Sequence, residues 1–293
     1  MSLTVVPDDR LLFAVPKKGR LHDKIVTLLH GAGLEYHRPP RVDLALCSSL
    51  PVTLVFLPAA DIATYVGDGK VDLGITGQDI IAESQTVVDE LLPLGVGCCR
   101  LGVQAPTTKN VARVADLAGH RIVTSYPHVT RTFFQQYESE TSGPTTITYV
   151  SGSVEVACAL GLADAIVDLV ETGTTMKAAG LELVATIMTT QAVLIANPGS
   201  RHKDVLQTVT ERIRGYLTAT QYKLVTYNVD ADKLDAATEI TPGRRAPTVN
   251  GLVGGGYAVS AMVEGKHVAR VMDQLHAIGA TDIMIFNIEN CRA

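Results

Sequence analysis

The chain has 293 residues, of which 46% are hydrophobic, and a formal net charge of −5 at neutral pH. This length suits two or three domains with cores of their own. A negative charge without a long basic run argues against nucleic acid as a partner. No apolar stretch approaches the roughly 20 residues that a membrane span needs, and the acidic start, with Asp8 and Asp9, does not resemble a signal peptide. We therefore expect a cytoplasmic protein.

Cysteine usage points the same way. The five cysteines are Cys47, Cys98, Cys99, Cys158 and Cys291. Their number is odd and no Cys-x-x-Cys pair occurs, so we expect reduced thiols and no zinc site. The adjacent pair at 98–99 could be redox-active, but small buried apolar side chains are the favoured interpretation.

The first third of the chain repeats one unit, a strand followed by a loop and a helix. Strands are predicted over 11–16, 52–57 and 71–76, and helices over 23–30 and 58–66. Such a repeat predicts a mostly parallel sheet. The third strand ends in Gly77 and Asp79, at the start of another helix.

The middle of the chain predicts a second lobe and a return to the first. Strands are expected over 95–104, 121–125, 146–150, 165–170 and 190–196, with helices over 154–160 and 201–218. In open α/β sheets, ligands collect at the carboxyl ends of strands. Polar residues stand at several of these ends, and we expect them to meet in one cleft between two lobes: Lys18, Arg20, Gly77, Asp79, Ser125 and residues 171–175.

The most informative segment is a buried strand that ends in a polar loop. Residues 165–170 are apolar except for Asp168, as in a parallel strand covered on both faces. The loop that follows is Glu171, Thr172, Gly173, Thr174 and Thr175. Threonine hydroxyls, backbone N–H groups at a helix start and a glycine suit a phosphate monoester, and the acids suit ribose hydroxyls or Mg²⁺. The pattern favours a sugar-phosphate site; an ordinary helix cap is the alternative.

The C-terminal part changes character. Strands over 222–229, 248–253, 257–263 and 282–288 and helices over 231–240 and 266–278 follow the order β-α-β-β-α-β. That order is typical of a small ferredoxin-like module. Because few of its residues suit catalysis, we expect it to serve regulation or assembly.

Four motifs, in their order along the chain, and the C-terminal end are similar to those of a known enzyme family. The motifs are residues 14–21 (AVPKKGRL), 71–77 (VDLGITG), 163–173 (ADAIVDLVETG) and 241–248 (TPGRRAPT), and the end is 287–292 (NIENCR). The chain resembles the long form of ATP phosphoribosyltransferase, the first enzyme of histidine biosynthesis, over nearly its whole length. The 14–21 motif and residues 55–62 (VFLPAADI) are closest to fungal members.

The resemblance implies a fold, a reaction and partners. The fold would be α/β, a two-lobed core like that of type II periplasmic binding proteins with a C-terminal ferredoxin-like domain. Residues 1–102 plus 191–218 would form catalytic lobe I, 103–190 lobe II, and 219–293 a regulatory histidine-binding domain. The enzyme would join N1 of ATP to C1 of phosphoribosyl pyrophosphate with Mg²⁺, releasing pyrophosphate. Dimers and hexamers, with feedback inhibition by histidine, are further expectations.

Candidate site residues follow from the motifs and the loop together. Asp168 and Glu171 are the catalytic candidates, and Asp168 is also the metal candidate. The substrate-binding candidates are Lys18, Gly19, Arg20, Gly77, Asp79, Glu155, Thr172, Gly173, Thr174 and Thr175, and the allosteric candidates are Asn228 and Thr248. Each group has a structural alternative: a solvated loop for Lys18 and Arg20, a helix cap for Glu155, and strand-end hydrogen bonding in the tail.

Two other functions remain open at this point. A two-lobed core with a small sensor domain could bind a ligand without chemistry, although the acids kept beside the loop disfavour this. Transfer of phosphoribose to another base would use the same loop. No general base is evident, and the N1 lone pair of adenine needs none. Asn228 also stands where some relatives have an acid, so that histidine binding would be weaker or differently arranged here.

Overall fold

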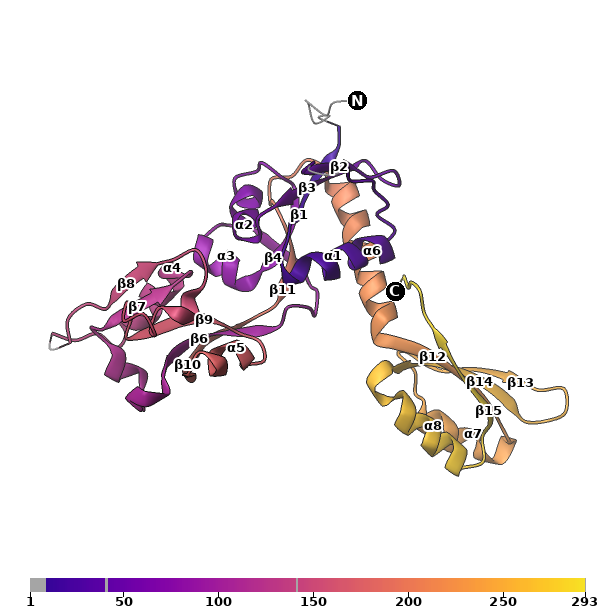
Figure 1. Cartoon of the computed structure of the whole chain (residues 1–293). Helices are drawn as coiled ribbons and strands as arrows, with labels where there is room; N and C mark the ends of the chain where they lie inside the picture. The colour runs from indigo at the N-terminus through magenta and orange to yellow at the C-terminus, as the bar shows by residue number, and fades with distance from the viewer. Residues whose placement is uncertain (1–8, 40–41, 141, 293) are drawn as a thin grey trace. The chain divides into compact units, whose positions relative to one another are not determined.

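The computed structural model describes residues 9–39, 42–140 and 142–292, apart from the side chain of Arg20. Two compact units make up the chain. Unit 1 contains residues 1–26 and 36–206, and unit 2 contains residues 27–35 and 207–293. Helices α1 (Arg20–Gly31) and α6 (Lys203–Gln221) each carry the chain from one unit into the other (Figure 1).

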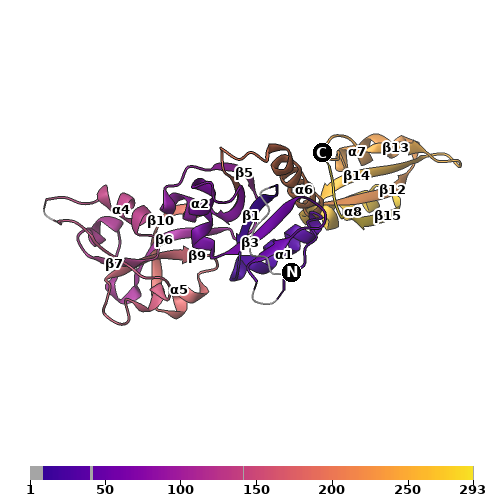
Figure 2. The same cartoon turned by 90° about the horizontal axis from the view of Figure 1, so that it is seen from above.

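Lobe I of unit 1 is built on a six-stranded sheet in the order β2-β3-β1-β4-β11-β5. Its strands are β1 (Leu11–Pro16), β2 (Leu44–Leu46), β3 (Val52–Leu57), β4 (Leu73–Gly77), β5 (Asp89–Pro93) and β11 (Ala192–Ala196). Strand β1 lies beside and parallel to β3 (Figure 2), and it also pairs in parallel with β4, which confirms the predicted parallel centre. Strand β11 instead runs antiparallel between β4 and β5.

Two helices of lobe I are relevant to the site. Helix α2 (Ala59–Gly67) turns Ile62 and Val66 toward the sheet, where they pack with Ala14 and Ile195. Helix α3 (Gln78–Ser84) begins directly after β4. Because the strand leads into the helix within one residue, the polar groups at 77–79 lie at the carboxyl edge of the sheet.

Lobe II contains a five-stranded sheet in the order β10-β6-β9-β7-β8. Its strands are β6 (Cys99–Pro106), β7 (Arg121–Thr124), β8 (Thr146–Tyr149), β9 (Ala165–Val170) and β10 (Leu181–Thr190). Its helices are η1 (Thr107–Lys109), η2 (Val114–Leu117), α4 (Pro127–Gln135), η3 (Val154–Val156) and α5 (Thr174–Ala178). Cys99 pairs with Thr190, so the strands that enter and leave the lobe lie side by side.

One predicted helix in lobe II is wrong. In place of a helix over 154–160, only the 3-10 turn η3 forms, followed by further turns. Ser153 before it holds a left-handed φ of 51°, and Gly161 after it a φ of 72°, so the segment is bounded by turns on both sides. Val154 and Ala157 still bury their side chains in the lobe II core.

Unit 2 contains a four-stranded antiparallel sheet in the order β13-β14-β12-β15. Its elements are β12 (Tyr222–Val229), η4 (Ala231–Lys233), α7 (Leu234–Ile240), β13 (Thr248–Gly251), β14 (Tyr257–Glu264), η5 (Gly265–His267), α8 (Val268–Ala277) and β15 (Thr281–Asn287). Helices α7 and α8 lie on one face of the sheet (Figure 1). There Val225, Tyr227 and Val259 pack against Val271 and Leu275. The predicted ferredoxin-like module is confirmed.

Candidate active site

The polar loop 171–175 surrounds a cavity at the end of β9. The cavity has a volume of about 220 Å³ and is lined by Gln104, Glu155 and residues 168–176. Gly173 has a left-handed φ of 78° and leads into α5, a conformation that favours glycine. The hydroxyls of Thr172 and Thr174 lie 3.0 Å apart. Among the described lining residues none is a lysine or arginine, so hydroxyl groups, backbone N–H groups and the amide of Gln104 are the donors that line the cavity.

Asp168 and the buried Gln104 form the floor of this loop cavity. The carboxylate of Asp168 accepts a hydrogen bond from the N–H of Leu169 at 2.8 Å. Its backbone carbonyl accepts one from the amide of Gln104 at 3.2 Å. Gln104 is only 2% exposed, and our sequence reasoning missed it. The available signal was a single amide side chain in residues 101–105, the buried part of β6, whose other members are apolar or glycine.

A second, more apolar pocket of about 210 Å³ adjoins the loop cavity, and Leu169 and Glu171 line both. Its other lining residues are Leu21, Lys24, Ala59, Gly77, Asp79, Ile80, Gly97, Cys99, Tyr126, Gln191 and Ala192. They come from both lobes of unit 1. Three of the residues expected to meet in one cleft, Gly77, Asp79 and Glu171, thus line the same pocket, whereas Ser125 does not occur among its described lining residues.

The amino-terminal loop candidates directly precede Leu21, which lines the apolar pocket. Lys18 and Gly19 are exposed and do not occur among the described residues that line the two cavities. Lys17 instead forms an ion pair of 2.6 Å with Asp43. That hydrogen bond holds the pKa of Asp43 below its usual value. The side chain of Arg20 lies outside the described part of the structure.

Asp79 is 5% exposed and engages both of its oxygens within the protein. Tyr126 donates its hydroxyl to one oxygen at 2.8 Å, and Thr190 donates to the other at 2.6 Å. The N–H of Asp79 donates in turn to the hydroxyl of Thr190 at 3.0 Å. Burial, and secondly the charge of Asp79, raises the pKa of Tyr126. Tyr126 therefore remains a hydrogen-bond donor throughout the physiological pH range.

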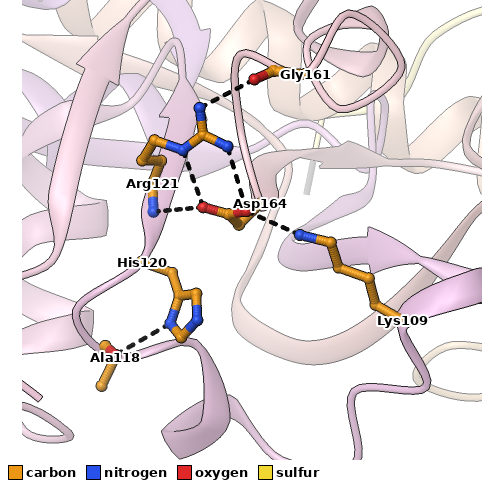
Figure 3. A network of polar contacts seen from close by, with 6 residues as sticks. All are labelled: Lys109, Ala118, His120, Arg121, Gly161 and Asp164. Carbon is orange, nitrogen blue, oxygen red and sulfur yellow. Dashed lines mark hydrogen bonds and ion pairs between the residues drawn. The ribbon is translucent and has the colours of Figure 1, made fainter.

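Asp164 lies at the start of β9 and makes contacts within lobe II (Figure 3). Arg121 donates from its backbone N and from Nε at 3.1 Å each, and Lys109 donates at 2.8 Å from the opposite side. The guanidinium of Arg121 also donates to the carbonyl of Gly161 at 2.9 Å. The hydrogen bond from Arg121, followed by that from Lys109, lowers the pKa of Asp164. This supports a structural role for Asp164.

The two tail candidates lie on the same face of the unit 2 sheet. Asn228 is opposite Ala258, and Thr248 is opposite Ser260, itself opposite Thr226. These positions alternate with Val225 and Tyr227, which face the helices, so the candidates are on the other face. The hydroxyl oxygen of Thr226 is buried without a hydrogen-bond partner among the described residues.

An acid accompanies Asn228. The amide of Asn228 donates to the carboxylate of Asp282 at 2.9 Å. Asp282 is exposed and holds a left-handed φ of 49°. A carboxylate is therefore present beside the position where the sequence showed only an amide.

Comparison with known proteins decides the family. Residues 58–215 match the family profile described as ATP phosphoribosyltransferase, and residues 219–290 match one described as HisG, C-terminal domain. The chain belongs to the ATP phosphoribosyltransferase family. This confirms the resemblance found in the motifs.

Full-length relatives support the assignment. The chain is 50% identical to the ATP phosphoribosyltransferase of Eremothecium gossypii over 296 residues, covering 100% of both. It is 50% identical to that of Saccharomyces cerevisiae, covering 97% of both. Among solved structures, a chain of the ATP phosphoribosyl transferase (HisG:HisZ) complex from Thermotoga maritima is 28% identical with a TM-score of 0.59, covering 70% of this chain and 96% of that one. The predicted two-lobed α/β core with a C-terminal domain is confirmed.

None of the helices in the described ranges is long and apolar enough to cross a membrane. Across the same ranges, no group of three or more His, Cys, Asp and Glu side chains is placed to hold a metal ion. A metal bound by the protein alone would need such a group, whereas a metal carried in by substrate phosphates needs only one or two carboxylates.

Proposed function

We propose that the loop cavity seats the 5-phosphate and ribose of phosphoribosyl pyrophosphate and that the adjoining apolar pocket holds the adenine of ATP. The chain then transfers phosphoribose to N1 of ATP and releases pyrophosphate, the first step of histidine biosynthesis. The observation that carries this proposal is the shared wall of the two sites, Leu169 and Glu171. A polar site rich in hydroxyl donors thereby adjoins a mostly apolar site of the kind that suits a flat base.

The two carboxylates explain the chemistry. Departure of pyrophosphate from C1 builds positive charge on the ribose ring, as in other glycosyl transfers. Asp168 and Glu171 line the cavity beside the position assigned to that ring. Fixed negative charge there stabilises the transition state more than the ground state. The N1 lone pair attacks directly, so no side chain has to remove a proton.

The donor set fits Mg²⁺ that arrives with the substrate. Mg²⁺ is usually held by one or two carboxylates together with substrate phosphates. Asp168, with Glu171 beside it, would hold the ion here. When bound, Mg²⁺ would neutralise the negative charge of the leaving pyrophosphate.

Threonine substitutions test the loop assignment. Thr172→Ala and Thr175→Ala each remove a hydroxyl donor to a charged phosphate, a contact worth roughly 1.5–3 kcal/mol. Binding of phosphoribosyl pyrophosphate, measured by calorimetry, should weaken by about tenfold to a hundredfold, while ATP binding stays unchanged. Thr148→Ala, an exposed substitution on β8, is the control. Unchanged affinity in both loop variants would reject the assignment. Asp168→Asn should lower turnover more than binding.

We assign regulation to residues 219–293, the part of unit 2 that contains its four-stranded sheet, with histidine as inhibitor. Thr226, Asn228 and Thr248 present polar side chains on the sheet face that α7 and α8 leave free within this unit. Asp282 supplies a carboxylate for an ammonium group. In this assignment residues 219–293 form the regulatory domain, while 1–102 with 191–218 and 103–190 form the two catalytic lobes. Assembly into dimers and hexamers and a cytoplasmic location complete the proposal.

A further inference from the structure

Helix α3 of lobe I presents two carboxylates to the start of α4 in lobe II. Asp79 and Glu83 are four residues apart, so they lie on the same face of α3. Both accept hydrogen bonds from the segment 126–129. Helices α3 and α4 are neighbours in unit 1 (Figure 1). Two acidic side chains of one lobe thus hold one helix start of the other.

The Glu83 end acts as a helix cap supplied from another lobe. Its two carboxylate oxygens accept the backbone N–H groups of His128 at 2.8 Å and Val129 at 2.9 Å. Tyr126, at the N-cap position of α4, makes no side-chain capping bond itself. The first N–H groups of a helix have no partner within it, and negative charge is favourable beside them. The first N–H groups of helix α4 therefore take their hydrogen-bond acceptors from lobe I.

The Asp79 end extends the contact to the strand that leaves lobe II. Tyr126 and Thr190 each donate to one oxygen of Asp79. Thr190 is the last residue of β10, next to the crossing into lobe I. Gly77 leaves the space that this carboxylate occupies, since a Cβ there would come within 2.1 Å of Asp79 Oδ1. The sequence at 77–79 is thus suited to placing a buried acid between the lobes.

We propose that Asp79 and Glu83, together with residues 126–129, form an interlobe clasp that fixes the spacing of lobes I and II. The apolar pocket takes its lining from both lobes, with Ala59 and Ile80 on one side and Tyr126 and Leu169 on the other. The loop cavity takes its lining from lobe II alone. The clasp therefore positions the two halves of the apolar pocket and leaves the loop cavity unaffected.

Glu83 offers the cleanest test, because it does not occur among the described residues that line either cavity. Glu138 provides the matched control. It accepts the N–H of Thr145 at 2.7 Å, so it is also a carboxylate that satisfies a backbone donor, but within lobe II. Glu138 also forms an ion pair with Arg131 within lobe II. Glu83→Ala and Glu138→Ala each remove a carboxylate that accepts backbone N–H groups, and only the first breaks the clasp. Glu83→Gln keeps one acceptor oxygen, so this variant should retain part of the contact between α3 and the start of α4.

Two measurements on the full-length chain test whether the clasp fixes the spacing of the lobes. Calorimetry compares ATP, whose base we assign to the two-lobed pocket, with ribose 5-phosphate, which we assign to lobe II alone; this arm rests on the proposed function. In Glu83→Ala the affinity for ATP should fall by up to about tenfold, because losing roughly one charged hydrogen bond lowers the population with the binding-competent lobe spacing by that factor. Ribose 5-phosphate should bind within twofold of wild type. Equal loss for both ligands, or the same loss in Glu138→Ala, would overturn the clasp.

The second measurement does not depend on any ligand assignment. Fluorophores on bio-orthogonal residues at Tyr65 of lobe I and Tyr149 of lobe II, both exposed, report the lobe spacing by single-molecule energy transfer. The distance distribution should broaden in Glu83→Ala and stay as in wild type in Glu138→Ala. An unchanged distribution in Glu83→Ala rejects the clasp. Failure of wild type to bind ATP would instead fault the proposed function, and the distance measurement would still decide on the clasp.

Discussion

Replacing Gly77 by alanine should destabilise unit 1 through a single steric conflict. The backbone of Gly77, with φ −82° and ψ 149°, is one that alanine adopts readily. The added Cβ would lie 2.1 Å from Asp79 Oδ1 and 3.1 Å from its Cγ. The carboxylate must therefore move away from a position in which Thr190 and Tyr126 donate to it at 2.6 and 2.8 Å.

The magnitude follows from the bonds that are displaced. Losing one hydrogen bond to a buried carboxylate costs roughly 1.5–3 kcal/mol, and the reduced freedom of the unfolded chain returns about 0.4–1 kcal/mol. We expect Gly77→Ala to lower the free energy of unfolding by about 0.5–2.5 kcal/mol. Urea unfolding followed by circular dichroism measures this. Gly152→Ala, where nothing lies within 4 Å of the new Cβ, should not destabilise the protein.

A double-mutant cycle tests the cause. In an Asp79→Ala background there is no carboxylate to displace, so Gly77→Ala should cost nothing further. Residues in contact show such non-additivity, whereas independent sites add. If Gly77→Ala lowered the free energy of unfolding equally in both backgrounds, the steric argument would be refuted. The destabilisation would then have to come from the end of the strand or the start of the helix.

Two further predictions concern other parts of the molecule. Asp164→Asn should lower the free energy of unfolding by about 1–3 kcal/mol at neutral pH. Because Arg121 lowers the folded-state pKa of Asp164, this advantage of wild type should be complete above about pH 4 and should vanish as the pH falls through the folded-state pKa. A pH-independent difference between the two proteins in urea titrations would contradict this. Thr248→Ala and Asp282→Asn should each raise the histidine concentration that half-inhibits the enzyme by about tenfold, the effect of one lost hydrogen bond to a charged group. Turnover without histidine should stay unchanged. If both variants were inhibited at the same histidine concentration as wild type, the regulatory site would have to lie elsewhere.

Local sequence patterns predicted the elements that depend on neighbouring residues. Strand β9 and the loop 171–175 are contiguous, so the apolar run and the polar break could be read directly. The ferredoxin-like order in the tail follows from alternating apolar residues and turn signals in the same way. The helix expected over 154–160 failed because buried positions at Val154 and Ala157 fit a short 3-10 turn as well as an α-helix.

Contacts between distant segments could not be predicted in this way. The sequence predicts Asp79 as a ligand contact, but its hydrogen-bond partners Tyr126 and Thr190 are 47 and 111 residues away in sequence. Only the arrangement of the two lobes brings them together. The same holds for Glu83 and the start of α4, 45 residues apart. The antiparallel insertion of β11 between β4 and β5 likewise depends on where the chain returns, which periodicity does not encode.

The position of β11 has a consequence for folding during synthesis. Strands β4 and β5 leave the ribosome early, but the strand that pairs with both, β11, follows only after all of lobe II. At about 5–20 residues per second, the facing edges of β4 and β5 stay unpaired for several seconds, and unpaired edges invite aggregation. Lobe II completes its own sheet only shortly before β11 emerges, because β10, which pairs with β6, directly precedes β11 in the chain. The rate at which the ribosome translates lobe II therefore sets how long the edges of β4 and β5 remain unpaired and open to aggregation.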